Sequence, residues 1–423
     1  MFMLDRIAEP VLGPTGLDSA FSPDEIAIRD GAHRFAEEVM RPIGRKLDAM
    51  SAEDVGAANS PLWQYLAAFR DSGLIDFETL DGMTPEQLGR IFPMIFEELG
   101  WGDSGLAILA LASSFPALMA HGTGNAELKE RFIGMPGCWI ATQPDRGSDV
   151  ANFDASEAHP GCQQSRGNLS ARLVGDEYVI HGQSSAWISG APIAQTALAY
   201  IPCDYGNGIN TDGAGLHHVA LLVPLDVPGV SKGKPVEKLG QRPLPQGELF
   251  FNEVRVPARY AIATRDKVFP SFMGALTFGN MEMAATFTGV ARAAFEHALA
   301  YAHERKQGGT AIINHQSVRL RIFDMWRKLE AGRALARRVF AYNYGSHAPH
   351  VLASVTSKTF CTQMALEVTN EAIQLFGGNG LTKEYPVEKL MRDARAALIE
   401  DGENNILALM GGTWLSRWYQ SQH

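Results

Sequence analysis

The chain has 423 residues, of which 46% are hydrophobic and 20% are charged, and its formal net charge is −10. A chain of this length is too long to fold around a single ordinary hydrophobic core, so we expect two or three domains. The net negative charge and the lack of any run of Lys and Arg argue against nucleic-acid binding. The cysteines have neither CxxC spacing nor a nearby histidine pattern, which argues against a disulfide framework and against a metal site.

The first residues, MFMLDRIAEPVLGPTGLD, contain Asp5, Arg6 and Pro10 and no continuous apolar run, so no signal peptide is expected. No run of ~18 apolar residues occurs, so no membrane span is expected either. Scattered cysteines fit a reducing compartment, and the sequence therefore predicts a cytoplasmic protein.

Residues 1–137 are predicted to form a helical domain. Ser22 and Pro23 suit the start of a helix, because a serine caps free N–H groups and proline is tolerated in the first turn. Residues 85–103 and 104–124 are predicted to form further helices, with glycine and proline as interruptions.

Residues 138–262 are predicted to form a small β domain, because short β-branched or aromatic runs replace the helical period. The candidate strands are 138–142, 176–182, 185–190, 195–201, 217–224 and 248–256. Two polar stretches, 152–170 and 203–215, are predicted to be surface loops.

Residues 263–423 are predicted to form long helices with short links, which favours an antiparallel bundle. In residues 281–306 one face of the predicted helix carries Phe287, Val290, Ala294 and Ala298. The sequence GGNG at 377–380 ends another long helix, as glycine often does. No phosphate-binding GxxxxGK[ST] and no GxGxxG after a strand is present, so a Rossmann domain is disfavoured.

Four motifs occur in one order along the chain: ATQPDRGSDVA (141–151), HGQSSAWISGA (181–191), YAHERKQGG with HQSV (301–318), and QLFGGNGLTKEYPVEKLMRDARAALIEDGENNI (374–406). Together they strongly resemble the signature of the acyl-CoA dehydrogenase family and extend over residues from about 25 to 420. The resemblance implies an α+β fold with an N-terminal α-helical domain, a central β-barrel-like domain and a C-terminal four-helix bundle. It also implies FAD as cofactor and an acyl-CoA thioester as substrate.

The resemblance also implies which residues bind FAD. The first motif lines flavin and substrate, the second packs on the ring, the arginine of the third reaches the pyrophosphate, and two glutamines contact FAD across a subunit boundary. The residues concerned are Thr142, Gly147, Ser148, Trp187, Ser189, Arg305, Gln316, Gln374, Gly377 and Gly378. From the residues alone, Trp187 is equally a core aromatic, Arg305 is better explained as a solvated helix charge, and each glutamine as an ordinary surface residue.

The stretch LIEDGENNIL crowds Glu400, Asp401 and Glu403 around Gly402. Alignment on RDA and on the following glycine puts Asp401 at the catalytic carboxylate position of the family, shortened by one methylene. Glu400 stands where the family usually has an aromatic residue, so it either points to solvent or joins the site. A register shifted by one residue would make Glu400 the base, and both remain candidates.

Other positions depart from the family pattern. Gly308 replaces an aromatic residue, Ser184 replaces a lysine, and the helix position of an alternative base reads Gly279-Asn280, with Glu282 nearby but out of register. These changes resemble the nitroalkane oxidase branch, which uses an aspartate base. The arginine that holds the aspartate in that branch corresponds here to Ala408, which puts nitroalkane oxidation in doubt.

The sequence thus supports an FAD enzyme that removes the α-proton of an acyl-CoA and passes the β-hydride to flavin. The alternatives are a nitroalkane-oxidase-like carbon-acid oxidase and a catalytically lapsed flavin-binding or assembly homologue. The resemblance implies a homo-oligomer, a tetramer or a dimer. It leaves electron-transfer flavoprotein and oxygen as possible electron acceptors.

Overall fold

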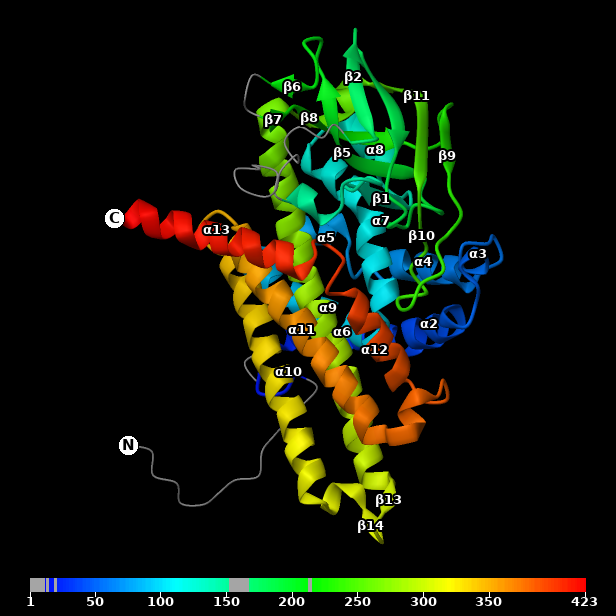
Figure 1. Cartoon of the computed structure of the whole chain (residues 1–423), viewed down its shortest axis with the longest axis vertical. Helices are drawn as coiled ribbons and strands as arrows, with labels where there is room; N and C mark the ends of the chain where they lie inside the picture. The colour runs from blue at the N-terminus through cyan, green and yellow to red at the C-terminus, as the bar shows by residue number, and fades with distance from the viewer. Residues whose placement is uncertain (1–11, 13–14, 19–20, 152–166, 212–214) are drawn as a thin grey trace.

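The computed structural model describes residues 12, 15–18, 21–151, 167–211 and 215–423 (Figure 1). Most of the polar stretch 152–170 and part of 203–215 lie outside the described residues, as does Cys162.

The chain begins with helices. They are α1 (Pro23–Phe35), which continues through η1 (Ala36–Met40) into α2 (Arg41–Asp48), and then α3 (Ala52–Val55), α4 (Pro61–Asp71), α5 (Phe77–Asp81), α6 (Pro85–Gly102), α7 (Ser104–Gly122) and α8 (Ala126–Phe132). Ser22 caps α1 as expected, because its side chain accepts from the backbone N–H of Glu25.

Two prolines behave differently from expectation. Pro93 and Pro116 lie inside α6 and α7 and do not end them. The break between the two helices is instead at Asp103, whose backbone is extended and whose side chain caps α7 at Leu106. Both prolines are buried, so packing around each helix outweighs the loss of one backbone hydrogen bond.

A central sheet follows the first helices. Its strands are β1 (Gly137–Ile140), β2 (Ser170–Val174), β3 (Glu177–Gln183), β5 (Thr196–Asp204), β8 (His218–Pro224), β9 (Val230–Lys232), β11 (Leu249–Pro257) and β12 (Ala261–Thr264). The order across the sheet is β12-β8-β5-β2-β3-β11-β9, with β1 parallel to β5. Outside this sheet, β4 (Ile188–Ser189) pairs with β10 (Gln246–Gly247), and β6 (Asn210–Thr211) pairs with β7 (Gly215–Leu216).

The strand predicted at 185–190 is wrong over most of its length. Only Ile188–Ser189 form a strand, and the preceding residues turn around the Ser185 side chain, to which the Trp187 N–H donates. The sequence also missed β2, β6, β7, β9, β10 and β12, and the β6–β7 pair begins inside the stretch 203–215 that was predicted to be a loop.

The last part of the chain is a set of long helices. They are α9 (Val268–Glu304), α10 (Gln316–Asn343), α11 (Val351–Phe376), α12 (Val387–Ala396) and α13 (Asn404–Gln422), with the short hairpin β13 (Lys306–Gln307) and β14 (Thr310–Ala311) after α9. Helices α9, α10 and α11 pack on one another, and α6 packs against α9 and α10. The predicted order of helices, sheet and helical bundle is confirmed.

Helix α9 belongs to both hydrophobic cores. Near its start Phe272 and Leu276 lie in the core of the sheet, and further along Phe287 and Val290 lie in the core of the bundle. It therefore passes the junction between sheet and bundle, where residues near 280 meet the turn before α13 (Figure 1).

Helix α7 is long and apolar enough to cross a bilayer, but 67% of that window is buried inside the protein. Its hydropathy is accounted for by packing between the helical core and the sheet core.

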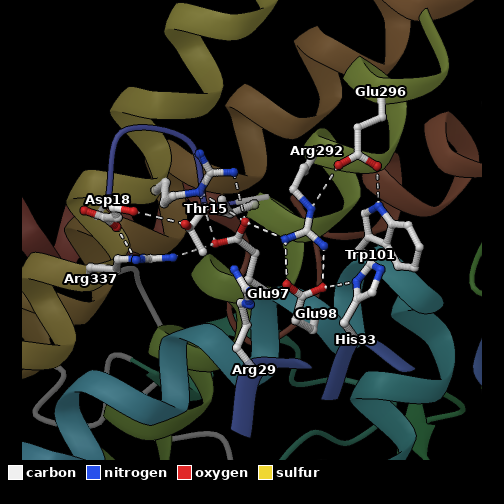
Figure 2. Close-up of polar contacts among 12 residues, drawn as sticks. Thr15, Asp18, Arg29, His33, Glu97, Glu98, Trp101, Arg292, Glu296 and Arg337 are labelled. Atoms are coloured by element: carbon white, nitrogen blue, oxygen red, sulfur yellow. Dashed lines mark hydrogen bonds and ion pairs between the residues drawn. The ribbon is translucent and has the colours of Figure 1, made fainter. Parts of the chain in front are cut away.

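A buried ion cluster joins α6, α9 and α10 (Figure 2). The guanidinium of Arg292 contacts Glu97 at 3.1 Å and also pairs with Glu98, while Arg333 contacts Glu97 at 3.0 Å. All four side chains are at most 3% exposed. Such a cluster fixes how the three helices are aligned, because each buried charge needs its partner.

Candidate active site

The two candidate bases, Glu400 and Asp401, lie in the turn between α12 and α13, together with Glu403. Asp401 has φ = 50° and Gly402 has φ = 92°, so two successive residues adopt the left-handed conformation. This conformation is uncommon for a residue with a side chain, although aspartate tolerates it better than most. Its persistence requires that the surroundings hold the turn.

Contacts from four separate segments hold this turn. Asn280 Nδ2 donates to the Asp401 carbonyl at 3.1 Å, and Lys358 Nζ donates to the Gly402 carbonyl at 2.7 Å. The Glu403 N–H donates to Ser148 Oγ at 2.9 Å. Gln241 Nε2 donates to the Glu400 carboxylate. The carboxylate of Glu403 then caps α13. The turn is thus fixed to α9, to α11 and to the loop predicted to bind flavin.

The Asp401 carboxylate is half-buried, and no hydrogen bond to it is recorded from the residues the structure describes. Burial raises its pKa above the usual range, and the cation of Lys358 opposes that rise. Its Oδ2 faces α9 at Gly279, where even an added Cβ would stand 3.8 Å away. An unengaged carboxylate with a raised pKa suits a general base.

Glu400 is engaged differently. Burial raises its pKa to about 7, the hydrogen bond from Gln241 opposes this, and the charge of Asp401 adds to it. The Gln241 backbone has φ = 49° and its N–H donates to Asp393, so the donor is itself held in place. Glu400 does not point freely to solvent, and of the two candidates Asp401 has the freer carboxylate.

Several residues predicted to contact flavin lie together beside this turn. Thr142 Oγ1 and Ser185 Oγ are 2.6 Å apart, and Gln246 Nε2 donates to Ser189 Oγ at 3.1 Å. Trp187 is 59% exposed. The tryptophan is therefore not a core residue, and its exposed ring offers a flat surface on which a heteroaromatic ring such as the isoalloxazine can pack.

Lys238 lies between the residues predicted to contact the flavin and the turn that carries Glu400 and Asp401. Its Nζ donates to Gln246 Oε1 at 2.8 Å. Burial lowers its pKa to about 8, against the effect of the Glu400 charge. Lys238 thus bonds to the side chain that contacts Ser189, and its charge interacts with that of Glu400 through space.

The remaining predicted FAD residues lie elsewhere. Arg305 follows the end of α9, Gln316 begins α10, and Gln374, Gly377 and Gly378 lie at the end of α11, all exposed. Asn280, beside Asp401, precedes Arg305 by 25 residues of this helix, or about 38 Å at ~1.5 Å per residue. Within one chain, the end of α9 with the hairpin β13–β14 therefore lies far from the turn that carries Asp401 (Figure 1).

Ring stacking joins the end of α9 to the end of α11, where Gln374, Gly377 and Gly378 lie. Tyr301 stacks on Phe376 with ring centroids 4.0 Å apart, and its hydroxyl accepts from Asn379 Nδ2 at 2.9 Å. A Cβ at Gly377 or Gly378 would meet nothing within 4 Å, so the backbone there is open to a ligand.

Sequence reasoning missed two site residues, Lys358 and Gln241. Lys358 is 0% exposed on α11, in a stretch where the neighbouring turns carry Val355 and Cys361. A lysine on an apolar helix face is the signal that would have marked it. Gln241 offered no such signal in its polar loop.

Glu282 also lies at this site, on α9. Burial raises its pKa to about 8, the Thr286 hydroxyl opposes this, and the charges of Asp401 and Glu400 add to it. Its Oε1 accepts from Thr286, while Oε2 has no hydrogen-bond partner among the residues described. This raised pKa favours the protonated carboxyl near pH 7.

Comparison with known proteins agrees with the fold and the motifs. Residues 138–254 match the family model for the acyl-CoA dehydrogenase middle domain, and residues 269–415 match that for the C-terminal domain. A probable acyl-CoA dehydrogenase of Bacillus subtilis is 30% identical over 382 residues, which cover 89% of this chain and 96% of the relative. The cyclohexane-1-carbonyl-CoA dehydrogenase of Geobacter metallireducens is 31% identical over 391 residues, covering 89% and 95%.

Among solved structures, butyryl-CoA dehydrogenase from Megasphaera elsdenii superimposes with a TM-score of 0.79 at 24% identity, covering 94% of this chain and 100% of that one. Glutaryl-CoA dehydrogenase from Mycobacterium smegmatis also gives 0.79 at 24%, covering 95% and 96%. These structures share the fold. Together with the two domain matches and the relatives at 30% identity or more, they show that the chain belongs to the acyl-CoA dehydrogenase family, whose members are oxidoreductases acting on CH–CH donors.

Proposed function

We propose that this protein oxidises an acyl-CoA thioester to its α,β-unsaturated form with Asp401 as the base. The observation that carries the proposal is the Asp401 carboxylate, which accepts no hydrogen bond from the residues the structure describes, in a turn held by Asn280, Lys358 and Ser148. A general base must be presented to its proton with little freedom, and this turn meets that need.

In the proposed reaction Asp401 takes the proton from the α-carbon, and the electron pair of that C–H bond becomes part of the new double bond. The β-carbon loses a hydride. Bound FAD would supply the acceptor for this hydride. The residues Thr142, Ser148, Trp187 and Ser189 would hold the ring on the side of the substrate away from Asp401.

The proposal includes a second copy of the chain. Arg305, Gln316 and the glycines at 377–378 would bind the pyrophosphate and adenosine end of FAD whose ring lies in another copy. The support is the distance of about 38 Å along α9, which separates the two groups within one chain. The site is then complete only in a homo-oligomer.

A cyclic or otherwise bulky acyl group is the proposed substrate class. Gly279, Asn280 and Ala285 are short side chains on α9, and one relative is a cyclohexane-1-carbonyl-CoA dehydrogenase. The electrons would pass from the flavin to an electron-transfer flavoprotein or to oxygen.

Nitroalkane oxidation is not supported, because Ala408 lines a groove with α10 and α11 and offers no group to hold Asp401.

The test is anaerobic mixing of the purified flavoprotein with straight, branched, cyclic and aromatic acyl-CoA compounds, with nitroethane as a further arm. We expect loss of flavin absorbance with at least one acyl-CoA and none with nitroethane. Reoxidation by air or by an electron-transfer flavoprotein then identifies the acceptor. A protein that takes up no FAD, or whose flavin no acyl-CoA reduces, would contradict the proposal and favour the assembly role.

A further inference from the structure

Lys358 is a cation in the interior of the protein. Its side chain is 0% exposed in the middle of α11, and lysine is almost never fully buried without a partner. Its Nζ donates to the Gly402 carbonyl at 2.7 Å and to Asn404 Oδ1 at 2.8 Å. Both acceptors belong to the turn that carries Asp401, on either side of Glu403.

These two acceptors are neutral, and no ion pair within 4.0 Å is recorded for Lys358 among the described residues. Burial lowers its pKa to about 8, and the charges of Asp401, Glu400 and Glu403 oppose that decrease. The ammonium group therefore acts on the carboxylates through space while its hydrogen bonds go to the backbone and the amide of the turn.

Asn404 extends the contact into a network. Its Nδ2 donates to Thr362 Oγ1 at 3.1 Å, one turn along α11 from Lys358, and its own N–H donates to the Leu398 carbonyl at 3.0 Å. Helix α11 thus holds both ends of the Gly402–Asn404 segment. Since Asp401 directly precedes this segment, its left-handed backbone depends on the same contacts.

We propose that Lys358 is a positioning residue of the active site: its two hydrogen bonds fix the turn that presents Asp401, and they place a positive charge at the carbonyl of the residue that follows Asp401. This inference rests on the proposed function of Asp401. A purely structural lysine would stabilise α11 and α13 without any effect on the ionisation of Asp401. The charged and titratable groups that face this region are Asp401, Glu400 and Glu403 of the turn, Glu282 of α9, and Lys238 beside Glu400.

The first test is the pH dependence of anaerobic flavin reduction in the full-length holoenzyme. Without the cation the pKa of Asp401 should be higher, so the rising limb of the rate should move to higher pH. We expect a shift of at least about one pH unit in Lys358→Met, little shift in Lys358→Arg, and none in Thr369→Val. Thr369 is a matched control, because it is buried on α11 and its hydroxyl bonds within the helix.

The second test needs no substrate. Hydrogen exchange of the peptide covering residues 398–407 should be about tenfold faster in Lys358→Met than in the parent or in Thr369→Val. If Lys358→Met does not fold, Lys358→Gln removes the charge and keeps a donor, and its pH profile replaces that of the methionine variant.

The outcomes separate this inference from the proposed function. Suppose that an acyl-CoA reduces the flavin of the parent enzyme, and that the pH midpoint of the rate is the same in Lys358→Met or Lys358→Gln as in the parent. The proposed role of the charge is then wrong. Unchanged exchange of 398–407 overturns the positioning role even if no acyl-CoA is a substrate. If no acyl-CoA reduces the flavin of the parent, but hydrogen exchange of residues 398–407 is faster in the variant, the proposed reaction is wrong. Lys358 is then still supported as a residue that holds the turn.

Discussion

At the residue scale, Asp401 combines a strained backbone with a carboxylate that makes no recorded hydrogen bond among the described residues. Asp401→Asn keeps the size and removes the proton acceptor, so we expect flavin reduction to fall by about 10²-fold or more while FAD remains bound. Stopped-flow absorbance measures the rate, and the flavin spectrum measures binding. Glu400→Gln is the matched control, and loss of reduction in this variant alone would identify Glu400 as the base.

The length of the Asp401 side chain is a second residue-scale question. Gly279 leaves space opposite its Oδ2, so a longer carboxylate has room to extend. We expect Asp401→Glu to retain reduction within about tenfold of the parent enzyme, because a shift of order 1 Å costs up to ~10²-fold only when the geometry cannot adjust. A rate as low as that of Asp401→Asn would show that the site is built around the shorter side chain.

Glu282 gives a prediction about stability. Its folded pKa of about 8 lies above its value in the unfolded chain, so the folded state binds more protons between about pH 4.5 and 8. Stability should therefore fall as pH rises through this interval. Glu282→Gln, which mimics the neutral acid, should remove that loss. Thermal unfolding at pH 5 and pH 8.5 measures the effect, and Glu304→Gln, exposed on the same helix, should leave the pH dependence of the parent unchanged.

At the scale of elements, the ion cluster between α6, α9 and α10 is a buried polar contact that links three helices (Figure 2). Burial alone would raise the pKa of Glu97, but Arg333, Arg292 and Arg337 hold it at about 2. Because this value is depressed, the stabilisation is complete above about pH 4.5 and is lost as the pH falls toward 2.

Glu97→Gln should destabilise the protein by about 3–5 kcal/mol at pH 7, since it leaves buried arginines without full compensation. Its unfolding free energy should also depend less on pH between 4.5 and 2. Denaturant unfolding at several pH values measures both. For Glu127→Gln, which removes the exposed pair with Arg259, the expected change is below about 1 kcal/mol. Equal losses in the two variants would contradict the role of the cluster.

At the scale of the whole molecule, the predicted FAD residues divide between the β region, around η2 (Ser148–Ala151) and β4, and the end of the bundle where α9 ends and α10 begins. Arg305→Ala should weaken FAD binding by about 10- to 100-fold without unfolding the protein, because a charge-assisted hydrogen bond is lost. Titration of the apoprotein with FAD measures this, with Arg319→Ala, an exposed arginine of α10, as control.

Mixed oligomers test whether two copies share one site. Asp401→Asn and Arg305→Ala should each impair activity as homo-oligomers. Co-expressed, they should recover activity, since one site of a mixed pair then combines an intact Asp401 with the partner's intact Arg305. Absence of recovery in an isolated mixed oligomer would show that each chain builds its own site.

The sequence by itself determined the family, the order of helical and β regions, and the positions of the motif residues. These are local properties: the helical stripe through Phe287 and Val290, the Ser22 cap and the spacing from RDA to Gly402 are written in consecutive residues. Domain boundaries at 137/138 and 262/263 stay predictions. The sequence was less successful with 185–190, where side-chain hydrogen bonds to Ser185 outweigh strand propensity.

Only the tertiary structure decided which residues surround Asp401. Lys358 reaches Gly402 across 44 positions of the chain, and Gln241 reaches Glu400 across 159. Periodicity does not reveal such contacts, because they depend on how α9, α11 and the sheet pack. For the same reason the sequence favoured Asp401 but kept Glu400 as an alternative base, whereas the fold engages the Glu400 carboxylate with the amide of Gln241 and shows no hydrogen bond from a described residue to the Asp401 carboxylate.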